Sequence, residues 1–181
     1  PAAHQAAAQL LMEQGQYEQA LQHLEQLQQL AGISQYDYLA ANASHLAPEQ
    51  QQAVLAHLQK LQQKQPDNAS LWYAIAIMHQ HLGQYADALD AINRTLKINP
   101  ALLSASLQKA RILVLLQRHD QALSWLQSVR KEYPQHKGIQ VLQARILLEQ
   151  RKMPEALQAF RDLHDSFPED SAILLSLALL E

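Results

Sequence analysis

Residues 69–102 read ASLWYAIAIMHQHLGQYADALDAINRTLKINPAL, and each half of this stretch carries apolar residues at helical spacing. Gly83 separates the halves, and Pro100 follows the second half, where a residue without an amide hydrogen cannot continue a helix. The periodic positions are Trp72, Ile75, Ala76, Ala88, Leu89 and Ile92. The stretch therefore predicts two helices joined by a tight turn.

The same pattern recurs along the chain with a step of 34 residues. Four prolines share this step: Pro66, Pro100, Pro134 and Pro168. Two columns of small residues share it as well: Ala8, Ala76, Ala110, Ala144 and Ala178, and then Ala20, Ala88, Ala122 and Ala156. Independent columns with one step indicate an internal repeat. We expect repeats at 1–34, 35–68, 69–102, 103–136 and 137–170, with 171–181 forming the first helix of a sixth.

The composition favours helices throughout. Ala, Leu and Gln dominate, and only 4 Gly and 7 Pro interrupt the 181 residues. The second repeat departs most from the pattern, because Pro48 stands where its first helix should end and Val54 replaces the small residue. We expect a shortened first helix there, with the turn displaced towards Ala47-Pro48. Pro154, after Met153, is expected in the first turn of a second helix.

The third repeat resembles the tetratricopeptide repeat, since Trp72, Ala76, Gly83, Tyr85 and Ala88 match its spacing. The first repeat has the same signature, whereas the fourth and fifth carry Gln117 and Arg151 in place of the turn glycine. The resemblance covers essentially residues 1–181. It implies one all-α solenoid, a right-handed superhelix of antiparallel helix hairpins with the first helices on its concave side.

The sequence contains no motif for catalysis, cofactors or metals. There is no cysteine, no glycine-rich phosphate loop and no H-E-x-x-H pattern among the nine histidines. His79 and His81 are two residues apart, so on a helix they point in different directions. We therefore expect no enzymatic activity, no cofactor and no metal in this segment.

The charges and hydropathy exclude two further classes of partner. The formal net charge is −3, and the mildly positive stretch 69–136 carries only seven basic residues against four acidic ones. That density is too low for a nucleic-acid footprint. No apolar run reaches the roughly 18 residues that span a bilayer.

The chain starts at Pro1 without a methionine, so we interpret it as a segment of a longer bacterial protein.

Two columns on the first helices carry more apolar residues than a solvated surface needs. By the resemblance, both face the concave groove. Their candidate ligand-binding members are Leu39, Tyr73, Ile77, Leu107, Arg111, Val141 and Arg145. Apolar side chains stand where relatives that clamp a terminal carboxylate use lysine, so that mode is not expected here. We expect the ligand to be a peptide with apolar side chains, and we expect Arg111 and Arg145 to bind either an acidic group or a backbone carbonyl of it. Alternatively, these columns only pack adjacent helices, and the arginines are surface charges.

The last helix, at 171–181, has no second helix to cover it within this sequence. We expect its leucines to leave apolar surface on more than one face: Leu174, Leu175, Leu177, Leu179 and Leu180. Helical arrays normally end with a polar capping helix. Self-association through this end is therefore possible.

The function expected from these features is a non-catalytic protein-binding adaptor. Two alternatives stay open: a self-association module using the apolar columns or residues 171–181, or the substrate-recruiting part of an enzyme whose catalytic domain lies elsewhere. The run LLSLALL at 174–180 and the composition resemble envelope lipoproteins that dock a periplasmic protease to its substrates. That resemblance favours the bacterial periplasm or cell envelope over the cytoplasm.

Overall fold

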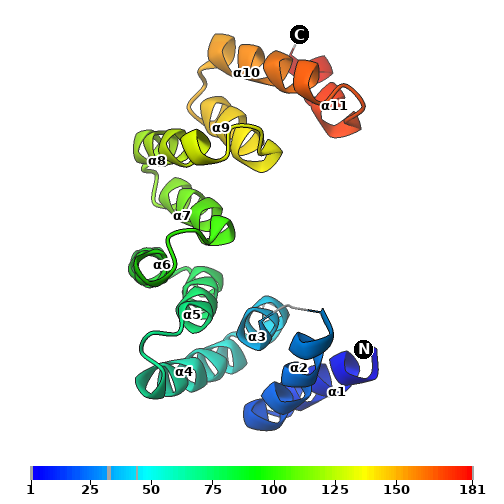
Figure 1. The fold of residues 1–181 in the computed structure, drawn as a ribbon, viewed down its shortest axis with the longest axis vertical. Coiled ribbons are helices and arrows are strands. Elements are labelled where there is room, and N and C mark those ends of the chain that lie inside the picture. Colours follow the sequence, from blue (N-terminus) through cyan, green and yellow to red (C-terminus); the bar gives the residue numbers. More distant parts are fainter. Residues whose placement is uncertain (1, 32–33, 44, 181) are drawn as a thin grey trace. The chain divides into compact units, whose positions relative to one another are not determined.

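The computed structural model describes residues 2–31, 34–43 and 45–180, and every element in them is an α-helix (Figure 1). The chain divides into two compact units, Pro1–Ala105 and Ser106–Glu181, with the division inside α7. The helices up to this point are α1 (Ala2–Glu13), α2 (Tyr17–Ala31), α3 (Gln35–Ala43), α4 (Pro48–Lys64), α5 (Ala69–His81) and α6 (Tyr85–Ile98). The remainder are α7 (Leu103–Leu115), α8 (His119–Glu132), α9 (Lys137–Glu149), α10 (Met153–Ser166) and α11 (Ser171–Leu180). The all-α solenoid expected from the sequence is confirmed.

Within the first unit, consecutive helices pack as hairpins, and each hairpin packs on the next. α1 packs on α2, α3 on α4, and α5 on α6. α2 also contacts α3, α4 contacts α5, and the first helices α3 and α5 lie against each other. A hairpin therefore buries its apolar face only together with its neighbours, as expected for a repeat array.

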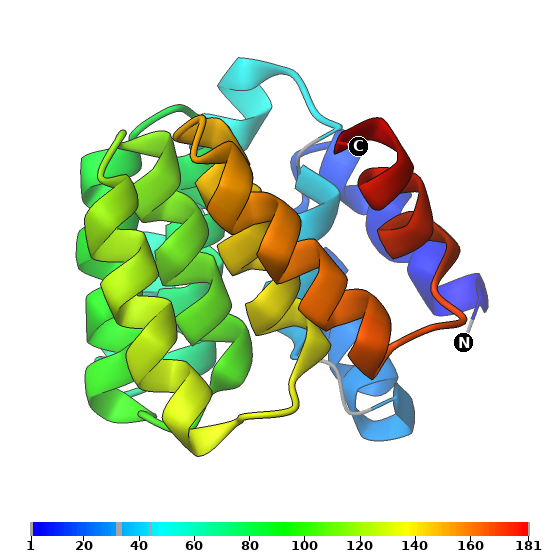
Figure 2. The ribbon, with the colours of Figure 1, turned by 90° about the horizontal axis from the view of Figure 1, so that it is seen from above.

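The second unit is built in the same way. α8 packs on α9, α9 on α10, and α10 on α11; the α9–α10 pair is visible from above in Figure 2. One buried cluster joins these last three helices: Ala144, Phe160, Leu163, Ile173 and Leu177. Small residues allow the close approach of helices in both units, since Ala76, Ala88, Ala144 and Ala156 are fully buried.

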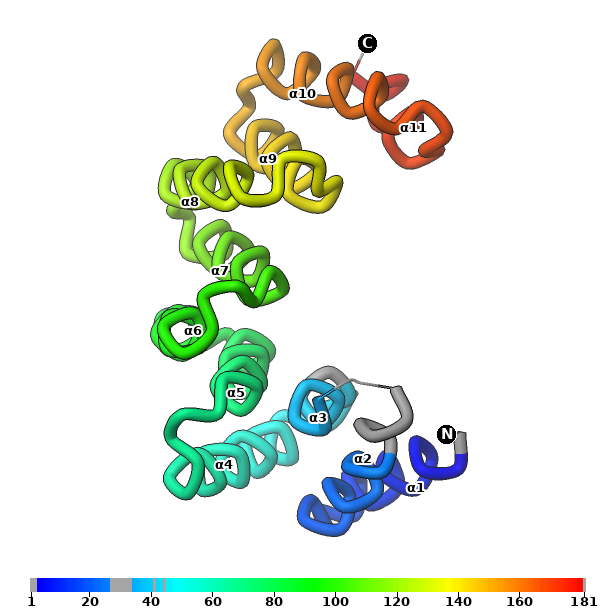
Figure 3. The backbone as a smooth tube through the Cα atoms, in the orientation of Figure 1, coloured from blue at the N-terminus to red at the C-terminus, as the bar shows by residue number. Residues whose placement is uncertain are grey.

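Four of the hairpin turns share one geometry, and Figure 3 traces the backbone through them. Gly15, Gly83, Gln117 and Arg151 all have positive φ, at 74°, 72°, 61° and 57°. At Gly83, the amide donates to Gln80 O (3.0 Å), while the next amide reaches back five residues to His79 O (2.8 Å). The same pair of bonds occurs at Gln117, at 2.8 Å each. These are Schellman turns, so the backbone keeps a left-handed residue even where the sequence supplies no glycine.

The second hairpin has the displaced turn that its sequence predicts. α3 ends at Ala43, and α4 begins at Pro48, whose missing amide hydrogen is tolerated in a first turn. Gln50 holds this start in place, because its side-chain oxygen accepts from the Ala47 amide at 3.1 Å. Its side-chain nitrogen donates to Glu13 O of the preceding hairpin at 3.0 Å. The expected Met153-Pro154 start is confirmed too, since α10 begins at Met153.

Two of the loops after second helices are closed by a side-chain hydrogen bond to a proline carbonyl. The Trp72 indole nitrogen donates to Pro66 O at 2.8 Å. Two repeats later, the Gln140 side-chain nitrogen donates to Pro134 O at 3.0 Å. In both cases the donor lies six residues after the proline. The bond ties the first helix of a repeat to the loop that introduces it.

Candidate functional site

The strongest candidate surface in the structure lies on the first helices of the second unit. Positions one repeat apart on α7, α9 and α11 form two columns. One column contains Leu107, Val141 and Leu175, and the other contains Arg111, Arg145 and Leu179. The first column is apolar throughout, and the second places two cations beside it.

Both columns end in an exposed leucine on α11. Leu107 and Val141 are half-buried, whereas the side chain of Leu175 is 63% exposed. Arg111 and Arg145 are exposed, and Leu179 is 78% exposed. The exposed members of the two columns, which are two arginines and two leucines, are therefore accessible to a ligand.

Other leucines of α11 serve the core instead. Leu177 is buried in the cluster with Phe160 and Leu163, and Leu180 is half-buried against it. The expectation that all of the α11 leucines leave apolar surface open is therefore wrong for Leu177. The physical reason is that α10 packs on α11 and covers this side of the helix.

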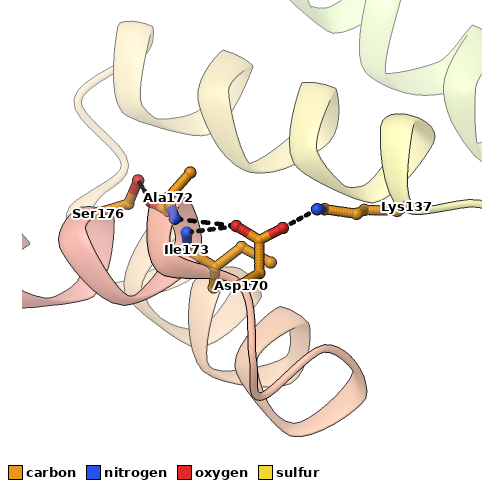
Figure 4. A network of polar contacts seen from close by, with 5 residues as sticks. All are labelled: Lys137, Asp170, Ala172, Ile173 and Ser176. Atoms are coloured by element: carbon orange, nitrogen blue, oxygen red, sulfur yellow. Dashed lines mark hydrogen bonds and ion pairs between the residues drawn. The ribbon is translucent and has the colours of Figure 1, made fainter.

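Polar contacts fix the starts of α9 and α11 relative to each other (Figure 4). The Asp170 carboxylate accepts from the amides of Ala172 (2.9 Å) and Ile173 (3.1 Å), which caps α11. The same carboxylate forms an ion pair with Lys137, the first residue of α9. Ser176 adds a hydrogen bond to Ala172 O at 2.7 Å. The two helices therefore present their columns from anchored N-termini.

The two arginines of the site are available for an external anion. Arg111 makes a long contact of 3.5 Å with the neutral side chain of Gln108. Among the residues that the structure describes, no carboxylate forms an ion pair with Arg111 or Arg145. A guanidinium offers several donors in a fixed plane, which suits a carboxylate. Both guanidinium groups are therefore exposed and carry no ion pair within the described residues.

The adjacent first helices approach each other at the edge of this surface. A Cβ placed on Gly138, in the first turn of α9, would lie 3.7 Å from the Leu107 Cδ1 atom. It would also lie 3.0 Å from Cε1 of His136, so that the His136 ring would have to shift. The distance to Leu107 is an ordinary van der Waals contact, so the glycine makes room for the His136 ring.

The first unit holds the remaining predicted ligand-binding residues. Tyr73 and Ile77 are half-buried on α5. Leu39 is completely buried on α3, so it belongs to the core and offers nothing to a ligand in this structure. The reason is local: the short helix α3 packs against α2, α4 and α5 together.

Two kinds of feature are absent from the described parts of the chain: metal-binding side-chain clusters and membrane-spanning helices. In residues 2–31, 34–43 and 45–180, no three His, Cys, Asp or Glu side chains gather closely enough to hold a metal ion. None of the helices in those ranges has the length and apolar character needed to cross a bilayer.

Family models described as tetratricopeptide repeat match nearly the whole chain. One matches residues 81–146, and a second matches residues 6–69, 52–102 and 141–181. The chain belongs to the tetratricopeptide repeat family. A curated relative, the TPR repeat-containing protein PA4667 of Pseudomonas aeruginosa, is 30% identical over 146 residues. That match covers 78% of this chain and 24% of the relative, so the chain spans about a quarter of that protein's length.

Solved tetratricopeptide repeat structures share the fold. TTC0263, a thermophilic TPR protein of Thermus thermophilus, has a TM-score of 0.69 and 17% sequence identity, covering 99% of this chain and 97% of its own. YrrB, described as a TPR protein with an unusual peptide-binding site, has a TM-score of 0.59 and 16% identity. The match covers 87% of this chain and 81% of YrrB. At such identities the likeness establishes the fold alone.

Leu175 and Leu179 are the members of the two columns that the candidate set from the sequence left out. They are also the exposed apolar members, whereas Leu107 and Val141 are half-buried. The 34-residue step already placed them in register with Val141 and Arg145, so the signal was present. Exposure distinguishes them from their counterparts, and exposure depends on which helices cover α11.

Proposed function

We propose that this chain is a non-catalytic scaffold that binds a protein or peptide segment on the first-helix surface of residues 106–181. The tetratricopeptide repeat fold supports a protein-binding scaffold in general. The observation that carries the finer proposal is the pair of exposed arginines, Arg111 and Arg145, beside an apolar column. The tetratricopeptide relative YrrB, described as having a peptide-binding site, supports the same class of ligand.

The chemistry of the surface supports a ligand that combines apolar side chains with acidic groups. Leu107, Val141 and Leu175 favour bulky apolar side chains, whose burial contributes roughly 1.5–3 kcal/mol each in gross terms. The arginines favour carboxylates at a spacing that spans neighbouring repeats. Exposed ion pairs add only about 0.2–1 kcal/mol, and association has a large entropic cost, so we expect micromolar affinity.

The experiment compares acetylated peptides in matched pairs, in which Asp or Glu alternates with Asn or Gln beside a constant apolar core. Binding is measured by fluorescence anisotropy for the wild type, Arg111→Glu, Arg145→Glu and Leu107→Ala. Both charge reversals should weaken the acidic peptides selectively, by about tenfold. Leu107→Ala should weaken both members of each pair. Arg130→Glu, at an exposed position on α8, is the matched control and should change nothing.

The surface assignment fails if both charge reversals keep full preference for the acidic peptides while circular dichroism shows an intact fold. A loss of binding in Arg130→Glu as well would instead indicate attraction by overall charge.

A further inference from the structure

Beside α6, on the first unit, two adjoining hollows share the side chain of Trp72. The first has a volume of roughly 400 Å³, and its walls come from α4, α5 and α6. The second, of roughly 560 Å³, continues it towards the C-terminal end of α6, as far as Ile98. Gln62, Trp72 and Arg94 line both hollows, so together they form one continuous depression. Trp72 is half-buried and Ile98, at the far end, is 36% exposed.

Four charged side chains of α6 line this depression in a fixed order. Asp87 and Asp90 lie along the first hollow, Arg94 is common to both, and Lys97 lines the second. At 100° per residue, the four positions fall within an arc of about 80° on the helix. All four are exposed. We call these residues the α6 charge stripe; it is acidic at one end and basic at the other.

The α6 charge stripe is not neutralised within the described chain. Asp90 and Arg94 are four residues apart, with the acid first, which is the arrangement that favours an intrahelical ion pair. Neither they nor Asp87 and Lys97 form an ion pair with any residue of 2–31, 34–43 or 45–180. Asp67, which lines the second hollow, likewise has no ion-pair partner in those ranges.

Helix stability explains only half of the stripe. An acid in the first turn and a base in the last turn complement the helix dipole, which accounts for Asp87 and Lys97. Asp90 and Arg94 lie in the middle of α6, where that effect has faded. The corresponding positions of α8 and α10 are Ser124 with Ser128 and Gln158 with Asp162. An acid followed four residues later by a base therefore occurs at this place in the third repeat and in neither of the two that follow.

The charges of the α6 charge stripe are complementary to those of a second, antiparallel copy of the same stripe. Its two acid–base pairs, Asp87 with Lys97 and Asp90 with Arg94, share one midpoint at residue 92. A twofold axis near that midpoint would place each acid of one helix opposite a base of an antiparallel copy. The contact would align four ion pairs across the two helices. We propose that the α6 charge stripe is a homodimer contact, in which α6 of a second copy lies antiparallel against it.

The second copy satisfies both ends of the stripe at once. A uniformly acidic or basic partner would meet repulsion at one end, and a purely apolar one would leave four charges facing it. Because the pairs stay partly solvated, the dimer is weak and sensitive to salt.

The test is a charge swap at the central pair, measured by sedimentation velocity. At about 200 µM protein and about 20 mM salt the wild type should be largely dimeric, and about 500 mM salt should dissociate it. Asp90→Arg and Arg94→Asp should each be monomeric under all of these conditions, because each brings like charges together. An equimolar mixture of the two variants should form dimers again, and so should the double variant Asp90→Arg/Arg94→Asp.

A matched control changes charges on the equivalent helix α8. Glu132→Arg and Arg130→Asp are exposed substitutions of the same kind, and each should dimerise like the wild type. Any of three results would overturn the proposal: a wild type that is monomeric under all of these conditions, single stripe variants that still dimerise, or a mixture of the two variants that stays monomeric. Dimers that persist in both stripe variants and dissociate in Leu175→Ser/Leu179→Ser would assign self-association to α11 instead.

Discussion

The turn residue Gln117 offers a direct measure of backbone strain in this chain. Its φ is 61°, in the left-handed region where a Cβ is disfavoured, while Gly83 holds the same place one repeat earlier at 72°. For an L-residue this conformation costs about 1–2 kcal/mol, and glycine removes that cost while losing about 0.5–1 kcal/mol of chain entropy. Gln117→Gly should therefore stabilise the fold by about 0.5–1 kcal/mol.

The reverse change at Gly83 isolates the same effect. A Cβ built on Gly83 meets no atom within 4 Å, so Gly83→Ala introduces no steric clash. The expected loss of about 1 kcal/mol is then purely conformational. Gln127→Gly, at an exposed position inside α8, controls for glycine as such and should cost about 1 kcal/mol.

Urea unfolding followed by circular dichroism measures all three variants. A real change in stability moves the midpoint and leaves the slope unaltered. For a chain of this length, 1 kcal/mol corresponds to a change of roughly 2–4 °C in Tm. A lower midpoint in Gln117→Gly, or an unchanged midpoint in Gly83→Ala, would refute the strain assigned to these turns.

Two further predictions concern buried and capping carboxylates. Burial raises the pKa of Asp37 to about 6, and its Oδ1 atom has no hydrogen-bond partner among the described residues. The folded state thus holds the proton more tightly than the unfolded state, so its stability falls as pH rises from about 4 to 6. Asp37→Asn should raise the free energy of unfolding by about 1–2 kcal/mol at pH 7.5 and leave it unchanged near pH 4. Urea unfolding at both pH values measures this difference. An equal gain at both pH values would contradict the prediction. Asp170→Ala removes both the cap of α11 and the ion-pair partner of Lys137. It should lower the free energy of unfolding by about 1–2 kcal/mol and speed up amide hydrogen exchange in residues 171–180. The control Glu169→Ala should change neither quantity.

The sequence predicted the features that depend on local chemistry. Pro154 lies in the first turn of α10, where a missing amide hydrogen is harmless, and this start was expected. The displaced turn near Ala47-Pro48 was expected too, although the start of α4 at Pro48 itself was not. The burial of Leu39 was not predictable from its column, because the column assumes that every first helix has the same neighbours. The α6 charge stripe also lies outside sequence reasoning. Its residues form no motif, and its interest depends on exposure and on the hollows beside it.

The proline carbonyl bond has a consequence for how such repeats diverge. Trp72 and Gln140 share no size, shape or hydropathy, yet each donates to the carbonyl of the proline six residues before it. Selection at this position can therefore act on whether the side chain places a hydrogen-bond donor within reach of the proline carbonyl. An aromatic residue and an amide can then serve the same structural role. Repeats of this kind can change in residue identity while their architecture stays the same. A sequence search for them should therefore score hydrogen-bond donors at that position as well as residue identity.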